Sequence, residues 1–190
     1  MAPREEEPTG IRLVPVGVLD PGRAAGLAAR LSRRVAAPCR VLPPMPRDGL
    51  PEIPERGQLD ADRLLRRLEG LADASGAVVL GVTSDDLAIP VFTFVFGRAR
   101  QGGRAAVVSL ARLDSRFYGL PADAGRTTER AVLETLHELG HVAGLPHCPD
   151  FACLMRFAAS VEALDVRGPD FCARCAARLP AWLGGPPRGT

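Results

Sequence analysis

The chain has 190 residues, of which 46% are hydrophobic and 24% charged, a composition typical of a folded globular domain rather than a disordered or fibrous chain. Its formal net charge is +2, and acidic and basic residues are interleaved, which argues against nucleic acid as a partner. The N-terminal residues lack the basic start and apolar stretch of a secretory signal, and the longest apolar runs are far shorter than the ~18 residues of a membrane span. We therefore expect a cytoplasmic protein with no membrane partner. We also expect a monomer.

The first half of the chain has the pattern of alternating strands and helices. Residues 11–19 form an apolar run rich in β-branched residues and predict a strand. Residues 21–35 predict a helix, because a proline stands near the start and apolar residues recur at helical spacing. A short strand is expected near residues 40–42. Apolar spacing then predicts a helix over residues 60–74 and a buried strand over residues 77–82.

Two further β-prone segments follow, at residues 91–97 and 105–110. The sequence between them, RARQGGR, contains paired glycines that suit the tight reversal of a hairpin, so we expect these two strands to pair with each other. Together with the earlier elements they predict a mixed sheet of about four or five strands flanked by helices.

The second half begins with a long helix, expected over residues 128–143, with Thr127 or Thr128 as its cap and Gly144 as its stop. This helix should lie at a cleft beside the sheet. After it the chain is dense in Cys, Pro and Gly, with few strand signals, until a further helix expected over residues 173–183.

These elements predict one α+β domain covering residues 1–190. Its N-terminal lobe, residues 10–144, resembles an α/β arrangement, whereas its C-terminal lobe, residues 145–185, is small and irregular. Such a lobe needs another source of order, and its cysteines are a candidate. Cys39 stands alone in the N-terminal lobe and is expected to be a small buried residue rather than a ligand.

A cluster of histidines on the long helix carries the clearest chemical signal. The run HELGHVAGLPH matches HExxHxxGxxH at every fixed position, and its histidines, His137, His141 and His147, are the three in the chain. Histidines four residues apart lie on one face of a helix, so both can bind one ion, with Glu138 beside a bound water as general base. Gly144 can turn the chain back to bring in the third histidine, leaving the fourth position open, as in a catalytic zinc site. The alternative is a helix with incidental histidines.

Four of the five cysteines, Cys148, Cys153, Cys172 and Cys175, follow at short spacings, the last two as CxxC. In a reducing compartment such a group predicts a closed tetrahedral zinc site, with one or two disulfides as the alternative. His147 and Cys148 are neighbours, and successive side chains of an extended chain point to opposite sides, so each can bind a different ion. We therefore expect two zinc ions, one catalytic and one structural.

These motifs resemble those of the archaemetzincins, a branch of the metzincin zinc metallopeptidases. The resemblance rests on HELGHVAGLPH, followed at once by Cys148, then by CLM at residues 153–155 and CARC at residues 172–175. It implies a metzincin-type fold. In that fold the structural zinc expected from the cysteine spacing would hold the C-terminal lobe against the active-site helix. It also implies that Met155 is the Met-turn residue, which packs beneath the catalytic zinc without coordinating it.

The metzincin resemblance also bears on substrate binding. Metzincins commonly hold the peptide as an extra strand along the upper rim of the cleft. Here the resemblance assigns that rim to Val91, Phe92, Thr93, Phe94, Val95 and Phe96. The alternative is that this strand is simply buried.

The motif predicts a zinc-dependent peptidase that acts on peptides or proteins. Water activated by zinc attacks the peptide bond, and Glu138 accepts its proton. Both aminopeptidase and endopeptidase action remain open. The alternative is a non-hydrolytic zinc-containing module that binds peptides or a partner protein.

Overall fold

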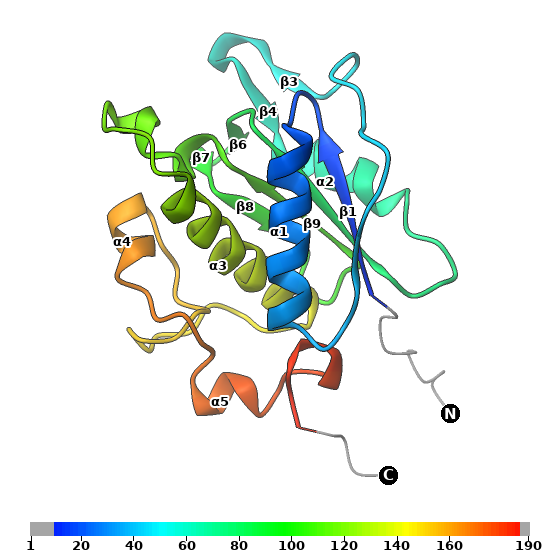
Figure 1. The fold of residues 1–190 in the computed structure, drawn as a ribbon, viewed down its shortest axis with the longest axis vertical. Helices are drawn as coiled ribbons and strands as arrows, with labels where there is room; N and C mark the ends of the chain where they lie inside the picture. Colours follow the sequence, from blue (N-terminus) through cyan, green and yellow to red (C-terminus); the bar gives the residue numbers. More distant parts are fainter. Residues whose placement is uncertain (1–9, 187–190) are drawn as a thin grey trace.

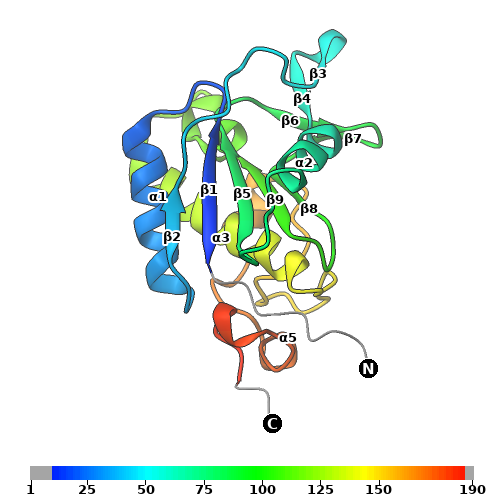
Figure 2. The same ribbon diagram turned by 90° about the vertical axis from the view of Figure 1, so that its right-hand side faces the viewer.

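The computed structural model of the chain describes residues 10–186 (Figure 1). Its centre is a five-stranded sheet with the order β2-β1-β5-β9-β8 (Figure 2). Four strands run parallel: β1 (Ile11–Val16), β2 (Cys39–Val41), β5 (Val78–Thr83) and β9 (Ala105–Ser109). The edge strand β8 (Gly97–Ala99) pairs with β9 in the antiparallel sense. The predicted mixed sheet with flanking helices is thus confirmed.

A second, four-stranded sheet lies beside the first, and the sequence patterns did not predict it. Its order is β3-β4-β6-β7, built from β3 (Glu52–Ile53), β4 (Gln58–Asp60), β6 (Leu87–Ile89) and β7 (Phe92–Val95). β7 is an edge strand of this sheet, and Phe96 alone separates it from β8, the edge strand of the larger sheet. One continuous stretch of chain therefore forms an edge of both sheets.

Helices cover both faces of the large sheet. α1 (Pro21–Arg34) and α3 (Ala124–Val142) pack on one face, and α2 (Ala61–Glu69) packs on the other (Figure 2). These three helices each begin at an aspartate whose carboxylate accepts a backbone N–H of the first turn, as Asp123 does at the start of α3.

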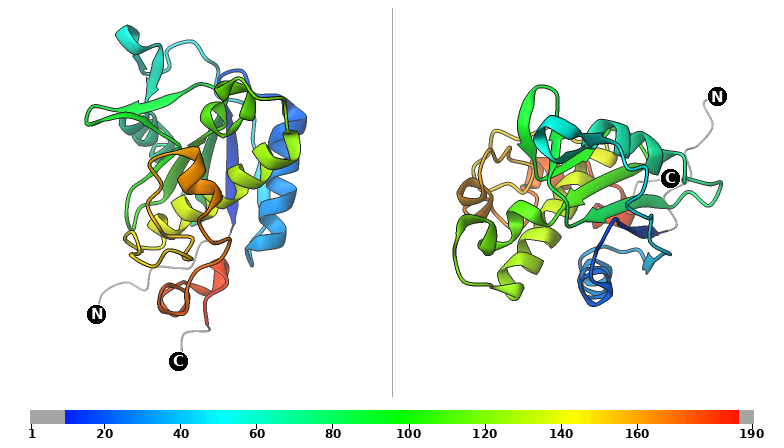
Figure 3. Two further views of the ribbon diagram at one scale, coloured as in Figure 1. Left: turned by 90° about the vertical axis from the view of Figure 1, so that its left-hand side faces the viewer. Right: turned by 90° about the horizontal axis from the view of Figure 1, so that it is seen from above.

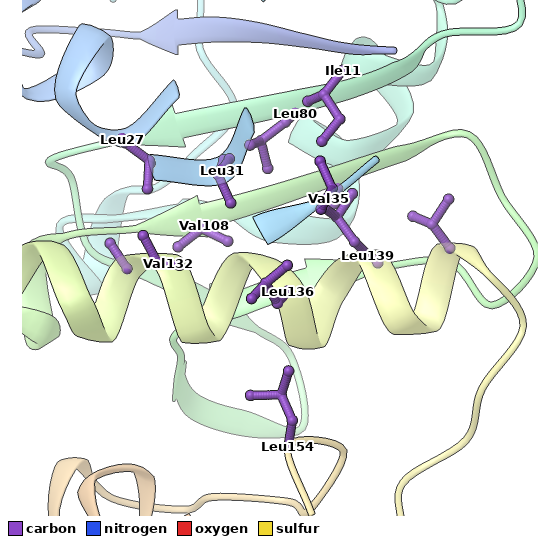
Figure 4. Close-up of a cluster of buried hydrophobic side chains, with 14 of the residues drawn as sticks. Ile11, Leu27, Leu31, Val35, Leu80, Val108, Val132, Leu136, Leu139 and Leu154 are labelled. Carbon is purple, nitrogen blue, oxygen red and sulfur yellow. The ribbon is translucent and has the colours of Figure 1, made fainter. Parts of the chain in front are cut away.

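The alternation of side chains along the strands divides the core in two. Leu80 of β5 faces α1 and α3 and packs in one cluster with Leu31 and Leu136, while the adjacent Val79 faces α2 (Figure 4). Leu154, from the C-terminal segment (residues 145–185), joins the first cluster from the other side of α3. The helix that carries the histidines is therefore packed between the sheet and the C-terminal segment.

The C-terminal segment has little regular structure: the short helices α4 (Val161–Asp165) and α5 (Ala173–Ala176) and a 3-10 turn at Ala181–Leu183. It runs beside α3 and ends below the sheet (Figure 3), where the carbonyl oxygen of Trp182 accepts a hydrogen bond from the backbone N–H of Ala36 at 2.9 Å. Three further 3-10 turns occur at Pro54–Arg56, Ala111–Leu113 and Ser115–Tyr118.

Several predicted elements were wrong in detail. Residues 91–97 do not form one strand paired with β9: β7 pairs with β6, and the hairpin with β9 is made by β8. The helix predicted over residues 60–74 ends at Glu69, and the one predicted over residues 173–183 ends at Ala176, four residues before Pro180. The cap of α3 is Asp123, not a threonine. Between residues 10 and 186, no helix combines the length and apolar character needed to cross a membrane.

Candidate active site

Three imidazoles converge at the C-terminal end of α3. His137 and His141 lie one turn apart on the helix, and Gly144, at φ 89°, ends it in the left-handed conformation, as predicted. The chain then turns back and brings His147 alongside. One nitrogen from each ring lies within 4.8 Å of the others, and the Nε2 atoms of His141 and His147 are 3.3 Å apart.

Backbone carbonyls orient the two helix histidines. Nδ1 of His137 lies 2.8 Å from the carbonyl oxygen of Leu154, and Nδ1 of His141 lies 2.7 Å from that of Leu145. A carbonyl can only accept, so each Nδ1 carries the proton and each Nε2 keeps a lone pair for a metal. Nδ1 of His137 is also 3.1 Å from Nη1 of Arg167, but two donors cannot bond to each other, so the Leu154 contact is the one compatible with metal binding.

The spacing of one histidine pair in this cluster fits a zinc ion. Two nitrogens each about 2.0–2.1 Å from a tetrahedral centre stand about 3.3 Å apart, which matches the separation of the His141 and His147 Nε2 atoms. Burial lowers the pKa of all three histidines below the usual value, so their neutral, metal-binding forms predominate at neutral pH.

Glu138 is buried between the helix and strand β8, with a side chain 4% exposed. Burial, reinforced by the negative charge of Glu134, raises its pKa well above the usual value, while the positive charges of Arg98 and Arg167 act in the opposite direction. A metal cation beside the carboxylate would also lower its pKa. Gly97 of β8 lies directly against this side chain.

A pocket of about 660 Å³ opens over the histidines and Glu138. One wall is the continuous edge formed by β7 and β8, and another is the segment just after Met155. The residues that line the pocket include three histidines, four phenylalanines and five charged side chains: His137, His141, His147, Phe92, Phe94, Phe96, Phe157, Arg98, Arg100, Glu134, Glu138 and Arg167.

An ion pair lies in the wall of this pocket. Nη2 of Arg167 donates to Oε2 of Glu134 at 2.9 Å, and the two side chains are 1% and 7% exposed. Glu134 stands one helical turn before Glu138, and its negative charge raises the pKa of Glu138. The positive charge of Arg167 acts in the opposite direction. Removing either partner would leave a buried charge unpaired, so separating the two side chains is costly.

The four clustered cysteines form a second group of candidate ligands. The Sγ atoms of Cys148, Cys153, Cys172 and Cys175 all lie within 4.8 Å of one another, and those of Cys148 and Cys172 are 3.9 Å apart. Sulfurs about 2.3 Å from a tetrahedral zinc stand about 3.8 Å apart, so this spacing also fits the metal. None of the cysteines forms a disulfide.

An arginine compensates the charge of the thiol cluster. Burial alone would raise the pKa of Cys148, but a hydrogen bond from Nη2 of Arg174, at 3.3 Å, contributes to lowering it to about 7. The pKa values of Cys153 and Cys175 are raised, mainly by burial. Cys39 lies apart from this cluster and is half-buried, and burial raises the pKa of its thiol to about 11.

Met155 lies under the helix between the two helix histidines. Its side chain is fully buried, and a Cβ added to Gly140 would lie 3.2 Å from its Cε and would overlap its Sδ. The sulfur is thus in van der Waals contact with the helix backbone beneath the histidine cluster. The backbone N–H of Cys148 donates to the carbonyl oxygen of Met155 at 2.9 Å, which ties the two motifs together.

The stretch assigned to the substrate rim lies along the pocket. Phe92, Thr93, Phe94, Val95 and Phe96 line it, whereas Val91 is 79% exposed and lies outside it. The strand is not simply buried, because Phe92 and Thr93 are exposed and only Phe96 is fully covered.

Sequence patterns missed several residues of the pocket. Glu134 could have been found, because its spacing of four from Glu138 places both on one helix face. Gly97 and Arg98 were assigned to a hairpin, and Phe157 and Arg167 carry no local signal. Arg167 contacts His137, from which it is 30 residues away in the sequence.

A helix with two histidines one turn apart, a glutamate between them and a third histidine beyond a glycine turn is typical of zinc metallopeptidases. The sequence pattern of peptidase family M54 matches residues 54–181. The archaemetzincin of Methanopyrus kandleri is 48% identical over 120 residues, which make up 63% of this chain and 65% of that protein.

Solved structures agree with the sequence relationship. A zinc-dependent peptidase from Methanocorpusculum labreanum has a TM-score of 0.79 and 30% identity, with 90% of this chain and 100% of that chain covered. The archaemetzincin of Archaeoglobus fulgidus, complexed with malonate, has a TM-score of 0.78 and 35% identity, with 90% and 99% covered. The chain therefore belongs to peptidase family M54, the archaemetzincins, which confirms the resemblance found in its sequence and the predicted fold class.

Proposed function

We propose that the protein hydrolyses peptide bonds, with His137, His141 and His147 holding a catalytic zinc and Glu138 acting as general base. The observation that carries the proposal is the convergence of three imidazole nitrogens within 4.8 Å, next to a buried carboxylate in a pocket of about 660 Å³. When bound, zinc makes water acidic enough to yield a nucleophile near neutral pH and polarises the scissile carbonyl.

The chain's own groups carry the proton and hold the ligands. Glu138 takes the proton from the attacking water and later delivers it to the leaving amine. The carbonyls of Leu154 and Leu145 keep the two helix histidines in the metal-binding tautomer, at 2.8 and 2.7 Å. Arg167 neutralises Glu134, so that Glu138 is not opposed by a second unpaired carboxylate.

The substrate in this proposal is an extended peptide that lies along the edge formed by β7 and β8. Both are edge strands, and the pocket follows them from Phe92 to Gln101. Part of β7 is already occupied on its backbone, because Nη2 of Arg56 donates to the carbonyl oxygen of Phe92 at 2.9 Å and Nε2 of Gln58 to that of Thr93 at 3.0 Å. The free pairing positions are therefore expected nearer β8.

A second zinc, held by the four clustered cysteines, completes the proposal. Its role is structural, because four thiolates leave no open coordination position. It would order a segment whose helices have only four or five residues and hold it against α3 within one domain. Thiols that must stay reduced fit the cytoplasm as the expected compartment.

The decisive experiment measures zinc per chain and the cleavage of a peptide library by wild type and by single variants. Two zinc ions per chain are expected, with the histidine-site ion lost in His141→Ala and the cysteine-site ion lost in Cys172→Ala. Glu138→Gln keeps the size and the metal ligands, so it should retain both ions and lose about 10²–10⁴-fold in kcat.

Two outcomes would contradict the proposal. If His141→Ala leaves the zinc content unchanged, the histidines are not a metal site. If wild type is fully loaded yet cleaves no peptide that it binds, the protein is a zinc-containing binding module.

A further inference from the structure

We propose that Gly97 is a positioning residue for the general base: the absence of a side chain on β8 provides the space in which the Glu138 carboxylate lies. This inference rests on the proposed role of Glu138 and adds a residue that neither metal ligation nor the histidine motif requires. A side chain at position 97 would move the carboxylate while leaving the three histidines untouched.

The space between Gly97 and the Glu138 side chain is too small for a Cβ atom. A Cβ placed on Gly97 would lie 2.7 Å from Cγ of Glu138, 2.8 Å from Oε1 and 3.0 Å from Cδ. Carbon atoms that are not bonded to each other pack at about 3.5–4.0 Å. A single methyl group is therefore enough to displace the carboxylate.

Backbone conformation does not explain this glycine. Gly97 is absent from the glycines with positive φ, and it forms a regular antiparallel pair with Val108. Glycine weakens a strand interior, and often marks a place where another group approaches the backbone closely. Here the approaching group is the Glu138 side chain.

Neither backbone is free to yield in place of the carboxylate. Next to Gly97, the carbonyl oxygen of Phe96 accepts a hydrogen bond from the backbone N–H of Ser109 at 2.8 Å, and the Phe96 side chain is 4% exposed. On the other side, Nε of Arg98 donates to Asp62 of α2 at 2.7 Å. Glu138 is on a helix packed between the sheet and the C-terminal segment, so its side-chain torsions are the softest degrees of freedom.

Two other glycines that lie against side chains distinguish this role from ordinary packing. A Cβ on Gly81 would meet the apolar side chain of Leu68, and one on Gly140 would meet Met155. Only at Gly97, among these three, is the neighbour an ionisable group that lines the pocket. Gly26 of α1 has nothing within 4 Å of an added Cβ and supplies a matched control for the change from glycine to alanine.

The test is a double-mutant cycle with Gly97→Ala and Glu138→Ala, using protein with its full zinc content and Gly26→Ala as control. We expect Gly97→Ala to keep both zinc ions and the wild-type KM, and to lower kcat about 100-fold, as misplacement of a catalytic group by about 1 Å can do. In the Glu138→Ala background the same change should alter the residual kcat less than about twofold, because the displaced group is no longer there.

Equal losses in both backgrounds, a rise in KM with kcat unchanged, or loss of zinc from Gly97→Ala would each overturn the inference. The same cycle is also measured by thermal unfolding, which needs no activity: Gly97→Ala should lower Tm in wild type and leave it unchanged in Glu138→Ala. If the Tm values show this dependence on Glu138 but the protein cleaves no peptide, the proposed function is refuted and the contact between Gly97 and Glu138 is supported. Additive shifts in Tm in an active enzyme would refute the contact alone.

Discussion

Breaking the ion pair between Arg167 and Glu134 should lower the free energy of unfolding by several kcal/mol. The two side chains are 1% and 7% exposed and meet at 2.9 Å, so both charges are removed from water. Arg167→Met leaves the Glu134 carboxylate buried without its cation, and Glu134→Leu leaves the guanidinium unpaired. Removing one partner of such a pair costs about 3–5 kcal/mol, whereas replacing both with apolar residues of similar volume is often neutral or stabilising.

Thermal unfolding at one fixed free zinc concentration is the assay, because bound metal contributes to Tm. For a chain of this length each kcal/mol corresponds to roughly 2–4 °C, so each single variant should melt about 6–20 °C below wild type. The double variant Arg167→Met/Glu134→Leu should recover most of that loss. Zinc content is measured alongside, because Nη1 of Arg167 lies 3.1 Å from Nδ1 of His137.

Two results would refute this reasoning. Single-variant losses below about 1 kcal/mol, the range of exposed ion pairs, would mean that water reaches the charges. A double variant as unstable as the sum of the two singles would mean that the side chains act independently.

Three further predictions concern pH, packing and capping. Burial lowers the pKa of the three histidines below 6.5 in the folded, metal-free protein. Below that pH the histidines of the unfolded chain are protonated while those of the folded protein stay neutral, so protonation favours unfolding. The free energy of unfolding of chelated protein should therefore fall as pH drops from about 6.5, and urea midpoints that stay constant from pH 7 to 5 would contradict this. Gly140→Ala should cost about 1–3 kcal/mol in urea unfolding, because its Cβ overlaps Met155; a neutral effect would show that the methionine is free to move. Asp123→Ala should cost about 1 kcal/mol in the same assay, because its carboxylate accepts the backbone N–H of Arg126 at 2.9 Å, and an unchanged midpoint would show that the cap is dispensable.

Local patterns predicted the parts of the fold that are set by local interactions. α1 and β5 are long enough for periodicity to show, and the histidines of α3 follow from one helical turn and one glycine stop. The small sheet escaped prediction because β3, β4 and β6 have only two or three residues, too few for any alternation to be read. Their partners were decided by tertiary packing, as was the division of residues 91–97 between two sheets.

The candidate site shows the same limit. Its candidate metal ligands come from two local motifs, so residue type and spacing were enough to propose them. The groups that surround Glu138 come from separate elements: Gly97 from an edge strand, Glu134 from the helix itself and Arg167 from the loop after α4. A glycine and an arginine are common on any surface, and only contact with a buried carboxylate gives them a role. That contact is long-range and leaves no trace in spacing.

The two candidate metal sites are joined so that one supports the other. Leu154, whose carbonyl oxygen orients His137, lies between Cys153 and Met155, and the backbone N–H of Met155 donates to Sγ of Cys153 at 3.4 Å. His147 is bonded directly to Cys148. In the proposed two-zinc protein, the cysteine site therefore fixes both the third histidine and the carbonyl that orients the first. The dependence is unequal, because the carbonyl oxygen of Leu145 orients His141 and Gly97 of β8 lies against Glu138, and neither contact involves the cysteines. Loss of the cysteine-site ion should thus weaken the catalytic site, while loss of the catalytic ion leaves the four thiolates in place.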